Sequence, residues 1–400
     1  MKISRQIFRW LPLVIFLVLF FYISHQLTAF TELSPTWTAG AVALTALPFV
    51  ITMILPLFFW SFRKSRLKHW QEVLLHWIHF SMGYINFLFV YVVIRDIISS
   101  VLRLSTSFDV SRFYDSRGLI VGWIFPFCLI ILGNAVVRVG PSLKKVSLFF
   151  ANLPPELENF RILHITDLHI GTSLPLAFVE RLKKLTQTVP ADMVVFTGDI
   201  VDGNAHQHHR EIELLGQIKS RYGSFYVPGN HEFYWKAEEI FAAIQNMGAT
   251  ILMNQNKILE VGTSNSTSPS TAKLQISGLV DPAAGMLSME GPNFDKTTQG
   301  QDPKAFQLLL AHQPFLADEA CKRGFDLQLS GHTHGGQFFP WNLMIHLFQK
   351  YNIGLYHVGK MQLYINQGTG YWGPSLRLGT YCEVTEITLR FAPETGKNKG

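Results

Sequence analysis

Four long apolar runs in the first 140 residues limit what this chain can fold into more than any other feature. The runs are Leu11–Phe30, Ala39–Trp60, Val73–Ile94 and Leu119–Val137. Each has roughly the 20 residues that an α-helix needs to cross the hydrocarbon core of a bilayer. They account for a mean hydropathy of +0.19 in a chain with only 16% charged residues. The sequence therefore predicts an all-α transmembrane region of four helices over residues 1–140.

The basic residues between these runs predict an orientation in the membrane. Lysine and arginine gather before the first run, between the second and third, and after the fourth, at Lys2, Arg5, Arg9, Arg63, Lys64, Arg66, Lys68, Arg138, Lys144 and Lys145. The first loop carries Glu32 alone. The third loop blurs the pattern with Arg95, Arg103, Arg112 and Arg117. Cytoplasmic loops are enriched in Lys and Arg, so we expect both termini in the cytoplasm.

The net charge of +6 does not indicate a nucleic-acid partner. No long Lys/Arg block is present, and much of the basic excess flanks the apolar runs, which points to the lipid bilayer as the partner. The three cysteines, Cys128, Cys321 and Cys382, are too few and too scattered for a disulfide framework. Reduced thiols agree with a cytoplasmic second half.

From about residue 158, short apolar runs alternate with longer amphipathic segments, which is typical of an α/β domain. Five of the short runs end in Asp, His or Asn. They are Ile162–Ile165 before TDLH, Met193–Phe196 before TGD, Phe225–Val227 before PGNH, Leu308–Leu310 before AHQP, and Leu327–Leu329 before SGHTH. Helices are expected at Leu174–Thr188 and Ala237–Met247, and a last strand at Val384–Leu389. Ligands gather beyond the carboxyl ends of strands in such sheets, so these endings predict a site.

The polar residues at these strand ends are oxygen and imidazole donors. The candidate metal ligands are Asp167, His169, Asp199, Asn230, His312, His332 and His334. This mixture suits Mn, Fe or Zn in a catalytic site rather than a structural zinc cage of cysteines. The set is too large for one ion, so we expect two divalent metal ions, with manganese the first choice. Asp199 is the expected bridge, because a carboxylate has two oxygens to share.

Such a pair of ions can generate the nucleophile that attacks phosphorus. Two cations about 3.5–4 Å apart both withdraw charge from a shared water. A bridging hydroxide then exists near neutral pH, and the cations offset the charge that builds on the phosphoryl oxygens. In an extended segment, residues two apart point to the same side, which explains the Asp167-x-His169 and His332-x-His334 spacings. Each motif alone is weak evidence for a metal site, whereas five such motifs in this order are specific evidence for one.

The order Asp-x-His, Gly-Asp, Gly-Asn-His, His, Gly-His-x-His resembles that of the calcineurin-like metallophosphoesterase superfamily. The resemblance covers roughly residues 158–390 and leaves out the apolar runs. The longer form SGHTHGGQ and the stretch LYINQGTGYWGPSLRLGTYCEVTEITL are similar to a bacterial branch whose members are often attached to membranes. Cys382 stands where that branch usually has a proline before Glu383, a departure that lies away from the candidate ligands.

The resemblance implies a four-layer α/β sandwich with the site at its edge. It implies that one ion is held by Asp167, His169, Asp199 and His334, and the other by Asp199, Asn230, His312 and His332. Asn230 and His231 are expected to be catalytic, with His231 contacting the phosphate and protonating the leaving oxygen. Arg377 is expected to bind substrate phosphate or to hold the glycine turn, and the sequence does not decide between these roles.

The expected activity is that of a metal-dependent phosphoric ester hydrolase acting on a phosphodiester or pyrophosphate. One relative in the branch cleaves the pyrophosphate of UDP-2,3-diacylglucosamine. A phosphorylated, lipid-linked small molecule at a bacterial inner membrane is therefore the substrate we expect. The alternatives are a phosphoprotein phosphatase, and a membrane scaffold or transporter whose phosphoesterase half is regulatory. Charged residues inside the apolar runs would favour transport, and the runs contain none.

The expected organisation is a transmembrane region at 1–140, a linker at 141–157, the phosphoesterase domain at 158–391 and a disordered tail at 392–400. His206, His208 and His209 follow the Gly-Asp motif. They form either a second metal cluster or a solvated loop, and the loop is favoured because no acidic partner frames them. Asp202 is interpreted as a turn residue.

Overall fold

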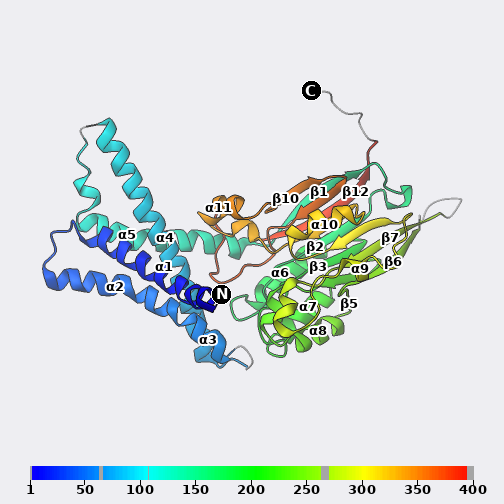
Figure 1. Cartoon of the computed structure of the whole chain (residues 1–400), viewed down its shortest axis with the longest axis horizontal. Coiled ribbons are helices and arrows are strands. Elements are labelled where there is room, and N and C mark those ends of the chain that lie inside the picture. Colours follow the sequence, from blue (N-terminus) through cyan, green and yellow to red (C-terminus); the bar gives the residue numbers. More distant parts are fainter. Residues whose placement is uncertain (1, 63–65, 107, 263–269, 394–400) are drawn as a thin grey trace. The chain divides into compact units, whose positions relative to one another are not determined.

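The computed structural model describes every residue except 1, 63–65, 107, 263–269 and 394–400, and describes no side chains for 2–12, 59 and 60. The chain forms two compact units (Figure 1). The helical unit comprises Met1–Phe62, Leu67–Ala135 and Gly373–Leu376, and the α/β unit comprises Arg63–Arg66, Val136–Trp372 and Arg377–Gly400. The expected tail, 392–400, lies outside the described residues apart from Ala392 and Pro393.

The first part of the chain is helical, coloured blue to cyan in Figure 1. Its helices are α1 (Lys2–Thr28), α2 (Pro35–Met53), α3 (Leu55–Phe62), α4 (His69–Ser105) and α5 (Ser116–Val139), with a short 3-10 helix, η1 (Val110–Phe113), before α5. Among the described residues, three helical segments are long and apolar enough to cross a membrane: Pro35–Phe58, His69–Ser105 and Ser116–Val139. By length and composition, they match the last three expected runs. The first expected span, Leu11–Phe30, lies in α1, whose described apolar part, Leu13–Thr28, is shorter, so this first span stays a prediction.

The apolar side chains of these helices are largely exposed. The exposed fractions of Trp37, Leu57 and Ile131 are 72%, 69% and 69%. Soluble proteins rarely leave a continuous apolar surface of this kind in water. The exposed belt therefore fits helices that lie in a membrane.

Two mixed sheets of six strands each build the described α/β unit. The first sheet has the order β1 (Ser142–Phe150), β12 (Glu383–Phe391), β2 (Arg161–Ile165), β3 (Met193–Thr197), β4 (Ser224–Val227), β5 (Ala249–Ile251). The second has the order β10 (Gly354–Val358), β11 (Met361–Ile365), β9 (Leu327–Ser330), β8 (Phe306–Leu310), β7 (Thr271–Gly278), β6 (Gln255–Gly262). The pairs β12–β2, β10–β11 and β6–β7 are antiparallel, and the other pairs are parallel. The expected α/β fold is confirmed.

Three apolar cores separate the layers of this unit. Val195 of β3 and Leu308 of β8 belong to the core between the sheets, whereas Val194 faces the opposite core, as alternate residues of a strand must. That second core packs the first sheet against α6 (Leu176–Thr186), α7 (His209–Gly216) and α8 (Ala237–Asn246). The third core joins Leu309 to α10 (Ala317–Lys322). The remaining α-helices of this unit are α9 (Phe294–Thr297) and α11 (Trp341–Phe348).

The register of the parallel strands brings the candidate motifs to one edge of each sheet. Ile165 of β2 pairs with Phe196 of β3, and Thr197 of β3 pairs with Val227 of β4. Leu310 of β8 pairs with Leu329 of β9 in the second sheet. The five predicted strands therefore end level with their neighbours, and the residues that follow them emerge together.

The segment 141–157, where we expected a linker, contains strand β1. This strand pairs in parallel with β12 from Ser142–Glu383 to Phe150–Phe391. Its burial alternates from Lys144 onward, with Leu148 and Phe150 buried, but the exposed Phe149 between them breaks the polar–apolar alternation that a sequence would show for a half-buried strand. Its partner lies about 240 residues later in the chain, which no local pattern can show.

We predict that Phe150→Ala destabilises the α/β unit by about 3–5 kcal/mol, because a buried aromatic ring leaves a cavity when removed. The Phe150 ring is 4% exposed and lies 4.9 Å, edge to face, from that of Phe306. Phe149, on the other face of β1, is 55% exposed and serves as the matched control, with an expected change below about 0.5 kcal/mol. Thermal unfolding of the detergent-solubilised chain measures both. Equal shifts would contradict the inward placement of β1.

Candidate metal centre

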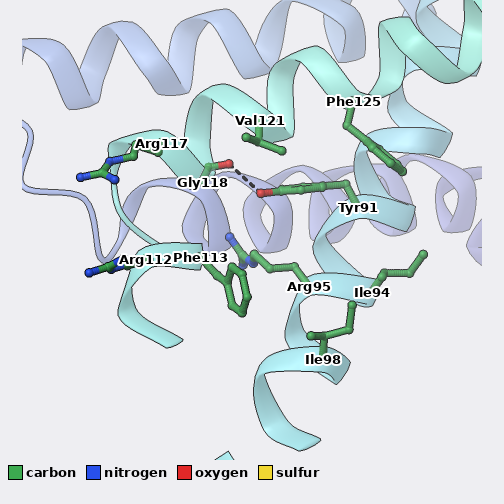
Figure 2. A pocket seen from close by; sticks show the side chains of 10 residues that line it. All are labelled: Tyr91, Ile94, Arg95, Ile98, Arg112, Phe113, Arg117, Gly118, Val121 and Phe125. Carbon is green, nitrogen blue, oxygen red and sulfur yellow. Dashed lines mark hydrogen bonds between the residues drawn. The ribbon is translucent and has the colours of Figure 1, made fainter. Parts of the chain in front are cut away.

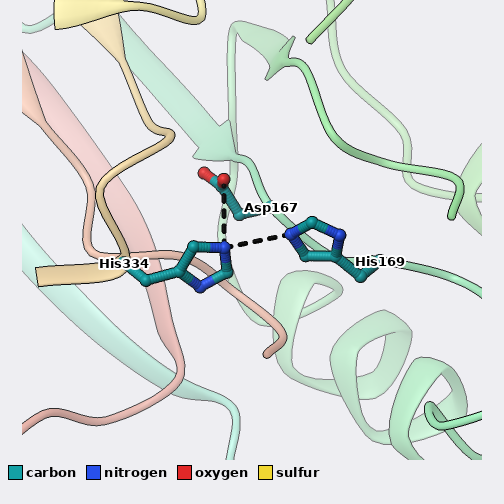
Figure 3. A group of neighbouring side chains, drawn as sticks. All are labelled: Asp167, His169 and His334. Atoms are coloured by element: carbon teal, nitrogen blue, oxygen red, sulfur yellow. Dashed lines mark hydrogen bonds and ion pairs between the residues drawn. The ribbon is translucent and has the colours of Figure 1, made fainter. Parts of the chain in front are cut away.

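The residues that follow β2, β3, β4, β8 and β9 converge. Three groups of Asp and His have possible ligand atoms within 4.8 Å of one another: Asp167, His169 and His334; Asp199, His312 and His332; and His169, Asp199 and His231. Figure 3 shows the first group: Asp167 and His169 come from the segment after β2 and His334 from the segment after β9, and the three side chains point toward one another. The groups share His169 and Asp199. The structure thus brings together every predicted Asp and His ligand.

Asp199 lies at the centre of this cluster. Its Oδ2 atom is 3.2 Å from His312 Nε2, 3.8 Å from His169 Nε2 and 4.0 Å from His231 Nε2. Its Oδ1 atom accepts the backbone N–H of His231 at 2.8 Å. One carboxylate oxygen thus faces three imidazoles contributed by three different segments.

Asp167 organises the neighbouring group. His334 Nε2 lies 3.4 Å from Asp167 Oδ1 and 3.0 Å from His169 Nε2. The buried carboxylate of Asp167 also accepts the Thr166 hydroxyl at 2.7 Å and the His332 backbone N–H at 3.0 and 3.1 Å. These bonds tie the end of β2 to the segment after β9, so the two sheets contribute to one site.

The backbone of the site differs from the extended segments that we predicted. Five candidate ligands have positive φ angles: Asp167 (51°), His169 (53°), Asp199 (51°), His332 (72°) and His334 (51°). In this region the side chain crowds its own backbone, and such strain persists only where surrounding structure holds it. The expectation that ligands two apart share a side because they are extended was wrong. Left-handed turns, rather than strand pleating, aim both members of each pair at the cluster.

The donor atoms fit divalent cations. His312 Nδ1 donates to the Thr197 carbonyl at 2.7 Å, so its Nε2 is left bare in the neutral ring and faces Asp199 Oδ2 and, at 3.3 Å, His332 Nδ1. Such facing acceptors need a proton or a cation between them. Asn230 Oδ1 is buried with no hydrogen-bond partner among the described residues, while its Nδ2 donates to Tyr234 Oη. A buried amide oxygen without a partner is costly unless a cation or a water binds it.

The electrostatics of the cluster reflect the same donors: burial lowers the pKa of His312, but Asp199 and then Asp167 raise it well above its usual range, so that without a cation the ring holds a proton. Burial disfavours the charge on Asp199, but the imidazoles of His312 and His231 outweigh it and hold the Asp199 pKa well below its usual range. Burial lowers the pKa of His332 to about 3, and His312 adds to the effect. Burial and the neighbouring His169 and Arg377 also lower the pKa of His334. Both histidines are therefore neutral at physiological pH, as metal ligands must be.

Comparison with known proteins identifies the family. A family profile described as calcineurin-like phosphoesterase matches residues 160–336. An uncharacterized metallophosphoesterase of Campylobacter jejuni is 34% identical over 281 residues, covering 68% of this chain and 71% of that protein. The chain belongs to the calcineurin-like phosphoesterase family. It is therefore a metal-dependent phosphoester hydrolase by family, and its site contains His and Asp groups that could bind metal.

Other relatives of this phosphoesterase share part of its length. A bovine transmembrane protein with metallophosphoesterase domain is 31% identical, over 66% of this chain and 61% of that protein. An uncharacterized metallophosphoesterase of Helicobacter pylori is 35% identical, over 62% of this chain and 64% of that protein. The matches span less than two-thirds of these two relatives. A solved sulfate thiohydrolase of Thermus thermophilus matches with a TM-score of 0.36 and 13% identity, over 60% of this chain and 57% of that chain.

Glu232, which the sequence analysis did not single out, anchors the loops of the phosphoesterase site. Its buried carboxylate accepts the backbone N–H groups of Asp199 (3.0 Å), Ile200 (2.7 Å), Val201 (3.1 Å) and Gly229 (2.8 Å). It therefore fixes the left-handed turn at Asp199 against the loop after β4. The one sequence feature that could have pointed to this role is the position of an acidic residue directly after Gly-Asn-His.

Asp202 is more than the turn residue that we expected. Its carboxylate lies 3.0 Å from His231 Nδ1 and 3.4 Å from His169 Nδ1, and it accepts the Trp235 indole N–H at 2.7 Å. Burial disfavours its charge, but the two histidines outweigh this and lower the Asp202 pKa. Burial likewise lowers the pKa of His231, but Asp202 and then Asp199 raise it to about 9. Asp202 thus keeps His231 protonated and orients His169. The sequence feature that could have pointed to this role is the position of Asp202 three residues after the candidate ligand Asp199.

Arg377 is fully buried beside this site. It donates to the carbonyls of Gln367 (2.7 Å), Gly368 (3.2 Å), Gly370 (2.6 and 3.0 Å) and His334 (3.2 Å). These bonds occupy the guanidinium and hold the glycine turn, which is one of the two roles we considered. The substrate-binding role stays a prediction that these contacts do not support.

The His206, His208 and His209 segment lies outside the three groups found among the described residues. His206 lies 3.6 Å from Glu239 and His208 lies 3.7 Å from Glu211, as ion pairs that need protonated imidazole. The acidic partners therefore come from α7 and α8, and the arrangement is that of a surface loop.

We predict that Glu232→Gln lowers the stability of the phosphoesterase by about 2–4 kcal/mol. The substituted amide N–H₂ faces two backbone donors that lose their acceptor, and each buried unsatisfied group costs about 1–3 kcal/mol. Glu239→Gln is the matched control, because Glu239 is partly exposed and, among the described residues, its ion-pair partners are the surface side chains of Lys236 and His206. Thermal unfolding reports both changes. A midpoint for Glu232→Gln equal to that of the control would refute the anchoring role.

We also predict a change in the pH profile of Asp202→Asn. Asp202 raises the His231 pKa, so its neutralisation lowers that pKa, by about one unit or more for an adjacent opposite charge. If His231 must be protonated to act as an acid, activity is lost as pH rises through this pKa. The basic limb of kcat against pH should therefore move to lower pH. Glu211→Gln is the control, and an unmoved limb in Asp202→Asn would exclude this link.

Proposed function

We propose that the chain is a membrane-anchored phosphoesterase that holds two divalent cations and hydrolyses a phosphodiester or pyrophosphate bond. The observation that carries the proposal is the pair of donor groups that meet at Asp199. One cation would be held by Asp167, His169, Asp199 and His334, and the other by Asp199, Asn230, His312 and His332. Manganese is the first choice for both, with iron or zinc as alternatives, because the donors are imidazole and oxygen.

The cations would offset phosphoryl charge and acidify a bound water. His231 supplies the proton for the leaving oxygen. Its protonated ring is held by Asp202 and lies 4.9 Å from the Tyr234 ring and 5.7 Å from the Trp372 ring. The Tyr234 hydroxyl also accepts a hydrogen bond from Asn230 Nδ2, which fixes the amide and leaves its buried Oδ1 without a partner among the described residues. The two aromatic rings leave His231 few orientations, so the proton is delivered from one position.

The apolar helices support attachment to a membrane, since the phosphoesterase is part of the same chain. We propose a transmembrane region at 1–140 with four spans and a catalytic domain at 158–391. The distribution of lysine and arginine favours a cytoplasmic catalytic domain in a bacterial inner membrane. A membrane-attached hydrolase meets lipid substrates readily, so we propose a lipid-linked pyrophosphate, such as UDP-2,3-diacylglucosamine, as its substrate.

We predict that the purified full-length chain hydrolyses bis(p-nitrophenyl) phosphate when manganese is added, and that EDTA removes this activity reversibly. Asp199→Ala should lower kcat/KM by about 100-fold or more, because it removes a ligand shared by both cations. His209→Ala, an exposed histidine outside the cluster, is the matched control and should keep wild-type activity. The proposal fails if Asp199→Ala and wild type give the same rate.

A panel of lipid pyrophosphates, phosphomonoesters, cyclic nucleotides and a phosphoserine peptide then assigns the substrate class. With manganese, zinc and magnesium in turn, we expect the highest kcat/KM for a lipid pyrophosphate. A higher value for the phosphopeptide would make the chain a protein phosphatase instead.

A further inference from the structure

A pocket of about 380 Å³ lies in the helical unit, between the C-terminal half of α4, η1 and the first half of α5 (Figure 2). Its lining consists of apolar and aromatic residues and three arginines, Arg95, Arg112 and Arg117. Small-molecule sites typically measure about 300–1,000 Å³ and combine apolar walls with a few polar groups. All of its lining residues belong to the helical unit.

The wall of the pocket is apolar and open to the surroundings of the helices. Ile94, Ile98 and Val121 line it and are 39%, 46% and 51% exposed. The ring of Phe125 continues the same wall (Figure 2). These residues sit on helices that are long and apolar enough to cross a membrane. A surface of this kind in a bilayer is contacted by acyl chains.

The floor of the pocket is electrically neutral. Arg95 is only 5% exposed, and it donates to Asp96 at 2.9 and 3.0 Å and to the Gln26 carbonyl at 3.0 Å. Its guanidinium also stacks 4.2 Å from the centre of the Tyr114 ring. Because these contacts already neutralise and hydrogen-bond the Arg95 guanidinium, Arg95 does not need an anionic ligand in the pocket.

The rim carries the available positive charge. Arg112 and Arg117 line the pocket, are exposed, and point to the same side in Figure 2. The neighbouring acids are engaged with backbone N–H groups: Asp109 accepts from Ser111, and Asp115 accepts from Arg117 and Gly118. Asp115 approaches Arg117 Nε only to 3.7 Å, and 81% of the Arg117 side chain is exposed. An exposed pair of this kind is weak and leaves the guanidinium free to bind another anion.

The depth of the pocket along α4 also suits a lipid headgroup. The 37 residues of α4 span about 55 Å at 1.5 Å per residue, whereas the hydrocarbon core of a bilayer is about 30 Å thick. The apolar run Val73–Ile94 ends 11 residues before the helix does, so we place the last turns of α4 past the core, in the headgroup region. Arginine is the side chain best suited to grip a phosphate there.

We propose that this pocket binds one anionic glycerophospholipid. The phosphate of the lipid lies between Arg112 and Arg117, and an acyl chain runs along Ile94, Ile98 and Val121. The lipid acts as a bound cofactor of the helical unit and is not the substrate of the metal centre.

Native mass spectrometry of the full-length chain, released from detergent with added lipid, tests the proposal. We expect one phosphatidylglycerol to be retained per chain, with at least about tenfold preference over phosphatidylcholine, because each surface arginine favours anionic lipid by roughly fivefold. Arg112→Gln combined with Arg117→Gln should weaken phosphatidylglycerol binding about 10- to 30-fold. Arg103→Gln is the matched control, since Arg103 is an exposed arginine at the end of α4 that does not line the pocket. It should change binding by less than about twofold.

A second variant tests the apolar wall without changing charge. Val121→Trp fills the pocket and, at a half-exposed position, leaves the helix packing in place. It should abolish retention of phosphatidylglycerol while the thermal unfolding midpoint stays that of wild type. Equal retention of phosphatidylcholine, or full retention of phosphatidylglycerol in both pocket variants, would overturn the proposal. Arginine-dependent binding of inorganic phosphate with no lipid retained would also overturn it.

Discussion

The carboxylate of Asp199 is the centre on which the phosphoesterase site depends. It is almost excluded from water, and its Oδ2 atom faces three imidazole nitrogens within 4.0 Å. Burying a carboxylate is costly unless positive charge and hydrogen bonds compensate. Here the histidines arrive from β4, β8 and the segment after β2, so the two sheets must pack together before the charge is compensated. The site is therefore a product of the whole sandwich rather than of one loop.

The remaining geometry holds that arrangement in place. Five candidate ligands adopt left-handed backbone conformations, which for residues with a side chain persist only under restraint. Glu232 supplies the restraint on Asp199 by accepting four backbone N–H groups. Arg377 does the same for the glycine turn beside His334. Glu232 and Arg377 are thus buried groups of opposite charge that bond to the backbone. They position the candidate ligands and are not candidate ligands themselves.

The strands that end at the site and most of the candidate ligands could be predicted from the sequence, because each depends on a short local pattern. Each apolar run that ends in Asp, His or Asn is a strand followed by a site residue, and parallel strands carry those endings to one edge. What could not be predicted depends on distant partners. β1 pairs with a strand about 240 residues away, and the contacts of Asp202 with His169 and His231 appear only when three loops meet. The φ angles at Asp167 and His334 likewise follow from packing, since neither residue favours them alone.

The measurement that tests the central claim most directly is the metal content of the full-length chain, purified without chelator and measured by inductively coupled plasma mass spectrometry. If Asp199 is shared between two cations, the wild type should retain about two divalent ions per chain. His332→Ala should then retain about one, and Asp199→Ala close to none. A wild type with at most one ion per chain, or an Asp199→Ala variant that still holds two, would contradict the account.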